Sequence, residues 1–122
     1  NCISILGIEI NKQAIKDANL NKKINNIENI SFKCGDVANI ITPKDKYDTI
    51  IVAPPRSGLS KKTRKILLEI STNYIIYVSC NPITLVRDIK ELSSKYELKD
   101  ITLFDLFPNT YHVESISLLI HK

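Results

Sequence analysis

The chain has 122 residues, 43% of them hydrophobic and 25% charged, which is the composition of an ordinary globular domain with one core. No apolar stretch is long enough to cross a bilayer and no secretory signal is visible, so nothing in the sequence indicates a membrane protein. The formal net charge of +4 is spread along the chain, so contact with nucleic acid is permitted but not required.

Three cysteines, Cys2, Cys34 and Cys80, form no Cys-x-x-Cys pair. Their odd number and their spacing indicate neither a disulfide framework nor a zinc or iron–sulfur site. We therefore expect a reducing, cytoplasmic environment and no metal in this part of the protein. The sequence has no methionine and opens close to a strand-like run, so we expect a fragment of a longer protein.

The first third of the chain predicts alternating strands and helices. A mostly apolar run at residues 3–10 predicts a strand buried on both faces. Asn11 is placed to cap the helix that follows, which the polar stretch 19–26 would end. Two further strands are expected at 30–34 and 47–52.

The alternation continues through the remainder of the chain. Residues 60–70 predict a helix with its lysine and arginine side chains outside, and residues 74–79 predict a strand. Pro82 suits the first turn of another helix, in which four apolar residues recur at helical spacing: Leu85, Val86, Ile89 and Leu92. Two successive strands, at 98–104 and 114–120, are expected at the end. This order predicts a single α/β domain with a mostly parallel sheet and a terminal antiparallel strand pair.

Two acidic residues follow the first two expected strands, and in such a fold binding sites lie at the carboxyl ends of strands. Glu9 could accept hydrogen bonds from ribose hydroxyls, or could be a solvated acid ahead of a helix. Asp36 could accept from an adenine amino group, or could form a turn or a helix cap. A glycine-rich phosphate loop ahead of Glu9 is absent from the sequence, which has glycine only at Gly7, Gly35 and Gly58.

Cys80 follows a strongly apolar strand and stands just before an expected helix, in the string SCNP. A free cysteine at a strand end is most often a small buried apolar residue. The position next to the positive end of a helix dipole is instead typical of a reactive thiol. Position alone leaves both interpretations open.

Glu114 opens the last apolar strand, directly after Tyr111, His112 and Val113. A carboxylate at the entrance to a buried strand is unusual, so Glu114 is a candidate general base, with an ordinary loop or edge acid as the alternative. His112 is a candidate partner of the site or a plain loop residue.

Four strings occur in an order that resembles one family: GIEINKQAIKDANLN, APPRSG, YVSCNPITLVRD and DLFPNTYHVESISLL. Together they resemble the S-adenosylmethionine-dependent RNA uracil-C5 methyltransferases that modify 23S rRNA and tRNA. The resemblance covers essentially the whole chain. It implies a Rossmann-like class I methyltransferase fold that lacks its first strand and glycine-rich loop, with 1–122 as one partial catalytic domain.

The resemblance also implies a role for each strand-end residue. Cys80 matches the nucleophile that adds to uracil C6, and Glu114 matches the base that removes the C5 proton. Glu9 matches the acid that holds the ribose of S-adenosylmethionine, and Asp36 matches the residue beside its adenine. The residues implied to line the RNA substrate site are Pro54, Pro55, Arg56, Asn81 and His112.

One position departs from the family pattern, because Ala53 stands where the family has an aspartate before Pro-Pro-Arg or Pro-Ala-Arg. Alanine cannot replace the hydrogen bonds of a carboxylate near the cofactor, so a non-catalytic RNA-binding relative stays an alternative. An RNA cytosine-C5 methyltransferase is a second alternative, although that class carries its nucleophile in a Pro-Cys string after the preceding strand. A methyltransferase for small molecules or proteins is a third, but it needs no cysteine nucleophile. We expect the isolated chain to bind the cofactor weakly and to methylate nothing.

Overall fold

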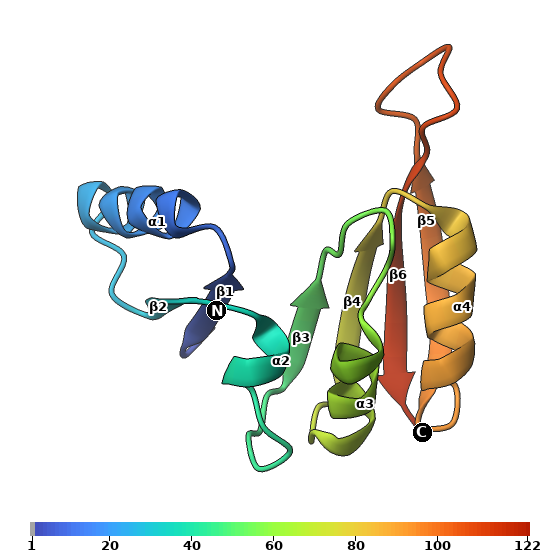
Figure 1. Ribbon diagram of the computed structural model, residues 1–122, viewed down its shortest axis with the longest axis horizontal. Coiled ribbons are helices and arrows are strands. Elements are labelled where there is room, and N and C mark those ends of the chain that lie inside the picture. The colour runs from blue at the N-terminus through green and yellow to red at the C-terminus, as the bar shows by residue number, and fades with distance from the viewer. Residues whose placement is uncertain (1) are drawn as a thin grey trace. The chain divides into compact units, whose positions relative to one another are not determined.

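The computed structural model describes residues 2–122 (Figure 1). The chain divides into two compact units, one ending at Thr42 and the other running over Pro43–Lys122. Each unit has its own sheet, and each is described on its own. No helix in the described residues is long and apolar enough to cross a membrane.

The first unit is a parallel strand pair with two helices. Strands β1 (Ile5–Glu9) and β2 (Ile30–Cys34) pair in register, with Glu9 opposite Cys34. Helix α1 (Lys12–Ile24) connects them, and a four-residue helix, α2 (Val37–Ile40), follows β2. The predicted cap is confirmed, because Asn11 Oδ1 accepts hydrogen bonds from the backbone nitrogens of the first helical turn at 2.8 and 3.2 Å.

The expectation that residues 3–10 are buried on both faces is wrong. Ile3 is 96% exposed, Ile10 is 71% exposed and Ile5 is 43% exposed. The physical reason is that β1 has a single strand neighbour, β2, and that α1 buries none of its residues. An apolar run predicts a strand, but its burial depends on how many elements pack against it.

The second unit holds a four-stranded sheet in the order β3-β4-β6-β5. The strands are β3 (Thr49–Val52), β4 (Tyr74–Ser79), β5 (Tyr96–Phe104) and β6 (Glu114–His121). Strands β3 and β4 are parallel, whereas β6 runs antiparallel to both β4 and β5. The predicted terminal antiparallel pair is confirmed. The sheets of the chain are nevertheless mixed rather than mostly parallel, because connection 105–113 returns β6 into the sheet between β4 and β5.

Helices α3 (Lys61–Glu69) and α4 (Pro82–Leu92) cover one face of this sheet (Figure 1). The apolar residues that they bury against the sheet are Leu67, Ile70, Ile75, Tyr77, Leu85, Leu92, Tyr96 and Leu119. The predicted apolar stripe of α4 is wrong at Val86, which is 65% exposed, while Asp88 is fully buried. Arg64 on α3 is also buried, although we expected the basic residues of this helix outside. These polar residues are buried because they bind one another, as described below.

The opposite face of the four-stranded sheet is apolar, and no helix of residues 43–122 covers it. It carries alternate residues of the strands, which the pleat directs to one side. Ile51 is 67% exposed, and Tyr74, Ile116 and Phe104 are 43%, 40% and 38% exposed.

Candidate active site

Cys80 and Glu114 flank one residue pair of the two central strands of the four-stranded sheet. Strand β4 ends at Ser79 and β6 begins at Glu114, and the two strands are antiparallel with Ser79 opposite Ser115. The Ser115 hydroxyl also donates to the Ser79 carbonyl at 3.5 Å. Cys80 is one residue beyond this pair on β4, and Glu114 is one residue beyond it on β6. The register therefore places the two candidate catalytic residues next to the same residue pair, at the carboxyl end of β4.

Cys80 is a free, half-buried cysteine between β4 and α4. It does not belong to the packed core, whose fully buried members lie on the strands and helices to either side. The turn that holds it is fixed by Ser79, whose hydroxyl accepts from the backbone nitrogen of Asn81 at 3.1 Å. The same hydroxyl donates to the Asn81 carbonyl at 3.0 Å. Cys80 is thus held in a hydrogen-bonded turn, and part of the residue is exposed.

Asn81 joins the start of α4 to the loop that follows β3. Its Oδ1 caps the helix by accepting from the backbone nitrogen of Ile83 at 3.1 Å. Its Nδ2 donates to the Arg56 carbonyl at 2.9 Å, and the Thr84 hydroxyl donates to the same carbonyl at 3.1 Å. Both ends of the amide are therefore engaged within the protein. The string SCNPIT positions Arg56 as well as Cys80, a connection that the sequence did not reveal.

A buried carboxylate fixes the far end of the same loop. Asp88 Oδ2 accepts from the backbone nitrogen of Leu59 at 2.7 Å and from the Tyr77 hydroxyl at 2.7 Å. Asp88 Oδ1 accepts from Arg87 Nε at 2.9 Å and from Arg64 Nη1 at 3.2 Å. Burial, and then the hydrogen bond to Asp88, raise the pKa of Tyr77, which keeps its hydroxyl a donor. Sequence reasoning missed this cluster, because periodicity gives no signal for a buried ion pair between two helices.

Gly58 ends the loop at the point where this cluster approaches the backbone. Its φ is +75°, a left-handed conformation that residues with a side chain rarely adopt. A Cβ atom here would lie 2.6 Å from Arg87 Nη2 and 2.7 Å from Asp88 Oδ2. Arg87 Nη2 also donates to the Ser57 carbonyl at 3.0 Å. The glycine is therefore required for the loop to close over the two charged side chains.

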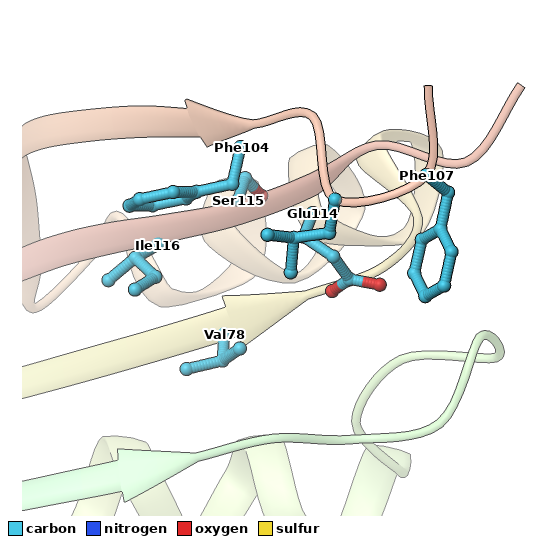
Figure 2. Close-up of a pocket in the computed structure, with 7 residues that line it drawn as sticks. Val78, Phe104, Phe107, Glu114, Ser115 and Ile116 are labelled. Carbon is cyan, nitrogen blue, oxygen red and sulfur yellow. The ribbon is translucent and has the colours of Figure 1, made fainter. Parts of the chain in front are cut away.

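The Glu114 carboxylate lies at an open hollow of about 340 Å³ (Figure 2). The residues that line this hollow are Val78, Phe104, Leu106, Phe107, Glu114, Ser115 and Ile116. Glu114 is half-buried, and all other residues that line the hollow are apolar except Ser115. Cys80 is not among the lining residues. The hollow thus offers one carboxylate in apolar surroundings, which is a suitable place for a base that takes a proton from carbon.

The other predicted substrate residues lie in two loops of the same unit. Pro54, Pro55 and Arg56 follow β3, and Pro54 is half-buried while the other two are exposed. His112 is half-buried in connection 105–113, and its ring centroid lies 4.3 Å from that of Tyr111. Because β3 and β4 are parallel, the loop after β3 leaves the sheet at the edge where Cys80 lies.

The two predicted cofactor residues lie together in the first unit. Glu9 and Asp36 follow neighbouring parallel strands, and the Gly35 nitrogen donates to the Glu9 carbonyl at 2.9 Å. Both side chains are exposed. Glu9 Oε1 accepts from the Asn11 nitrogen at 2.8 Å, and Asp36 Oδ1 caps α2 by accepting from a backbone nitrogen at 2.9 Å. Over residues 2–122, no group of three or more His, Cys, Asp or Glu residues could hold a metal ion.

Solved structures define the class to which this fold belongs. The chain is 37% identical to the Pyrococcus abyssi tRNA (uracil-54, C5)-methyltransferase in complex with S-adenosyl-L-homocysteine, with a TM-score of 0.86. That match covers 96% of this chain and 29% of the other. The N-methyltransferase NodS from Bradyrhizobium japonicum WM9 matches with a TM-score of 0.75 at 14% identity, over 99% of this chain and 75% of NodS. The fold is that of a class I methyltransferase.

The family follows from the sequence itself. A model of the tRNA (uracil-5-)-methyltransferase family matches residues 35–122, so the chain belongs to this family. It is 46% identical over 120 residues to an uncharacterized RNA methyltransferase of Clostridium acetobutylicum, covering 97% of this chain and 26% of that relative. It is 44% identical over 118 residues to another from Aquifex aeolicus, covering 94% of this chain and 28% of the relative. The chain spans about a quarter of the length of these curated relatives.

Proposed function

We propose that these 122 residues are part of the catalytic domain of an enzyme that transfers a methyl group from S-adenosylmethionine to C5 of a uridine in tRNA or rRNA, in the cytoplasm. The observation that carries the proposal is the pairing of Ser79 with Ser115, which sets a free thiol and a carboxylate at one sheet edge. Uracil C5 is a weak nucleophile. The thiol can activate C5 by adding to C6, and the carboxylate can then remove the C5 proton so that the C5–C6 double bond re-forms. Membership of the uracil-5-methyltransferase family supports the same reaction.

The chemistry divides between the two side chains. The Cys80 thiolate adds to C6 of the uracil, forming an S–C6 bond and placing the displaced electron pair on C5 and O4. When bound, S-adenosylmethionine supplies an electrophilic methyl group, to which C5 forms its new bond. The Glu114 carboxylate then takes the proton from C5, and the released electron pair re-forms the C5–C6 double bond as Cys80 leaves as a thiolate. The products are 5-methyluridine, S-adenosylhomocysteine and a protonated Glu114, which returns its proton to solvent.

The cofactor role of Glu9 and Asp36 rests on their place at adjacent strand ends. Exposed carboxylates there suit the ribose hydroxyls and the adenine amino group, both of which are hydrogen-bond donors. Ala53 contributes no carboxylate, so this position offers no side-chain hydrogen bond to the methyl donor.

The substrate residues act in two ways. We propose that Pro54, Pro55, Arg56 and His112 contact the target nucleotide, since they lie in the loops beside Cys80 and Glu114. Asn81 supports the site by holding the Arg56 carbonyl, because both ends of its amide are already bound within the protein.

The proposal is tested with the full-length protein, S-adenosylmethionine and RNA transcribed with 5-fluorouridine. Fluorine at C5 cannot be removed by a base, so the reaction stops at the methylated covalent adduct. We expect an adduct that depends on the methyl donor and maps to the peptide containing Cys80, and 5-methyluridine in ordinary RNA. If neither the adduct nor 5-methyluridine forms, the result would support the non-catalytic RNA-binding relative. Formation of 5-methylcytidine would support the cytosine-C5 class.

Replacing Glu114 by glutamine separates the two halves of the mechanism. Glutamine keeps the size of the side chain but cannot accept the C5 proton, so turnover on ordinary RNA should fall about 10²- to 10⁴-fold. The covalent RNA–protein adduct should accumulate, because addition at C6 does not need the base. Gel electrophoresis under denaturing conditions measures the adduct, and Glu97→Gln, at an exposed position of β5, is the matched control. A loss of turnover without adduct would mean that Glu114 acts before C6 addition.

A further inference from the structure

Connection 105–113 is folded into a defined turn, which the sequence FPNT explains. The Thr110 nitrogen donates to the Phe107 carbonyl at 3.2 Å, and the Thr110 hydroxyl donates to the same oxygen at 2.7 Å. Pro108 occupies the second turn position and Asn109 the third, with a φ of +63°, which is the pattern of a type II turn. The His112 nitrogen closes the turn by donating to the Thr110 hydroxyl at 3.2 Å.

The turn gathers three aromatic rings, Phe107, Tyr111 and His112, which we call the aromatic cluster. The His112 ring centroid lies 4.3 Å from that of Tyr111, with an angle of 34° between the planes, and 6.0 Å from that of Phe107. Tyr111 is 80% exposed and Phe107 is 52% exposed. The His112 ring therefore supports Tyr111 from one side and leaves the phenol largely open to a ligand.

A cation lies over the exposed Tyr111 ring. The Arg56 guanidinium carbon is 5.7 Å from the Tyr111 ring centroid, within the range of a cation–π contact. The Arg56 backbone is held by Asn81 and Thr84, so the base of this side chain is fixed while its end is exposed. The aromatic cluster and Arg56 come from two loops, and Glu114 follows His112 by two residues.

We propose that the aromatic cluster and Arg56 form a stacking platform for an unpaired base of the RNA that neighbours the target uridine. The base stacks on the exposed Tyr111 ring, and the Arg56 guanidinium contacts the adjoining phosphate. An unpaired nucleotide combines a π-face with an anion, and the site combines exposed rings with a cation, so the two surfaces are complementary. A purely apolar partner would bury Arg56 without compensating its charge.

The proposal rests on the proposed function and adds a source of binding energy to it. A uridine that reacts at C5 and C6 must leave the base stack, and its neighbour then loses a stacking partner. Tyr111 replaces that partner close to Glu114. It is a binding residue rather than a catalytic one, so its effect should fall on the affinity for RNA.

The test uses full-length protein and a stem–loop RNA that carries one loop uridine flanked by 2-aminopurine. The fluorescence of 2-aminopurine is quenched on stacking and reports both binding and stacking. Tyr111→Ala should raise the Kd about tenfold and abolish the quenching, since one stacked base is worth this much. Tyr111→Phe should bind as the wild type does, because it keeps the ring. Tyr111→Leu, which keeps apolar area without a π-face, should resemble Tyr111→Ala.

Two results would overturn the proposal. The first is an unchanged Kd for Tyr111→Ala, and the second is wild-type binding by Tyr111→Leu. A lower Tm of the free Tyr111→Ala protein together with an unchanged Kd would show in addition that the ring packs against protein. Adduct formation by the wild type on 5-fluorouridine RNA is followed in parallel. If the wild type forms no adduct, the proposed function fails, while the Tyr111 series still decides the stacking.

Discussion

Cys80→Ser in the full-length protein should abolish both methyl transfer and the covalent adduct with 5-fluorouridine RNA. A serine hydroxyl in the same turn is not ionised at neutral pH and adds poorly to C6, whereas a thiolate adds readily. Loss of a catalytic nucleophile lowers turnover by about 10⁴-fold or more. Liquid scintillation counting of a labelled methyl group in RNA measures turnover, and RNA binding should stay at its wild-type strength because the change removes no contact with the RNA backbone.

Cys34→Ser provides a matched control for this experiment. Cys34 is also free and also ends a parallel strand, but it is exposed and its Sγ donates to the Ile10 carbonyl at 3.6 Å. The same change there should leave turnover and adduct intact. Equal losses in the two variants, or persistent turnover in Cys80→Ser, would remove Cys80 from the mechanism.

Asp88→Ala should cause a large loss of stability of the second unit. It leaves the Tyr77 hydroxyl and the Leu59 nitrogen without their buried acceptor. The Arg64 guanidinium loses its buried ion pair and keeps the Leu59 carbonyl and the partly exposed Glu91. Removing one partner of a buried charge cluster costs about 3–5 kcal/mol, which is a large share of the stability of a typical domain. Arg87 is half-exposed and can turn to water, so it contributes little to this loss. Thermal unfolding of the full-length protein, followed by circular dichroism, measures the effect.

Asp100→Ala is the matched control for Asp88. Asp100 is exposed on β5, and its Oδ1 accepts from the backbone nitrogen of Ile101 at 2.8 Å. Its removal should shift Tm only slightly, because water replaces the lost acceptor. Similar shifts for the two variants would show that the Asp88 cluster does not hold the unit together.

The helix and strand positions could be predicted where local signals are strong. Strand Tyr74–Ser79 is a run of aromatic and β-branched residues, and Asn11 and Ser60 are side chains that cap the first turns of helices. Burial was predicted less well, because it depends on residues far apart in the sequence. Asp88 is buried because it meets Arg64 and Tyr77, and no helical periodicity contains that information.

For the candidate site, too, local features could be predicted and long-range contacts could not. The sequence predicted its position at strand ends and the candidates Cys80 and Glu114. The pairing of their neighbours Ser79 and Ser115 depends on the insertion of β6 between β4 and β5, and strand order is a property of long-range pairing. The SCNPIT string also holds the Arg56 carbonyl. This second role depends on the hydrogen bond from Asn81, which lies 25 residues further along the chain.

The uncovered apolar face of the four-stranded sheet has a practical consequence for work on this protein. Ile51, Tyr74 and Ile116 are exposed to water on this face. Residues 43–122 in isolation therefore expose an apolar surface of the kind that promotes self-association. Melting curves of such a piece would mix aggregation with unfolding, and its weak activity would not distinguish a defective site from a precipitated protein. Variants of Cys80, Asp88 and Tyr111 are therefore informative only in a longer chain that shields this face.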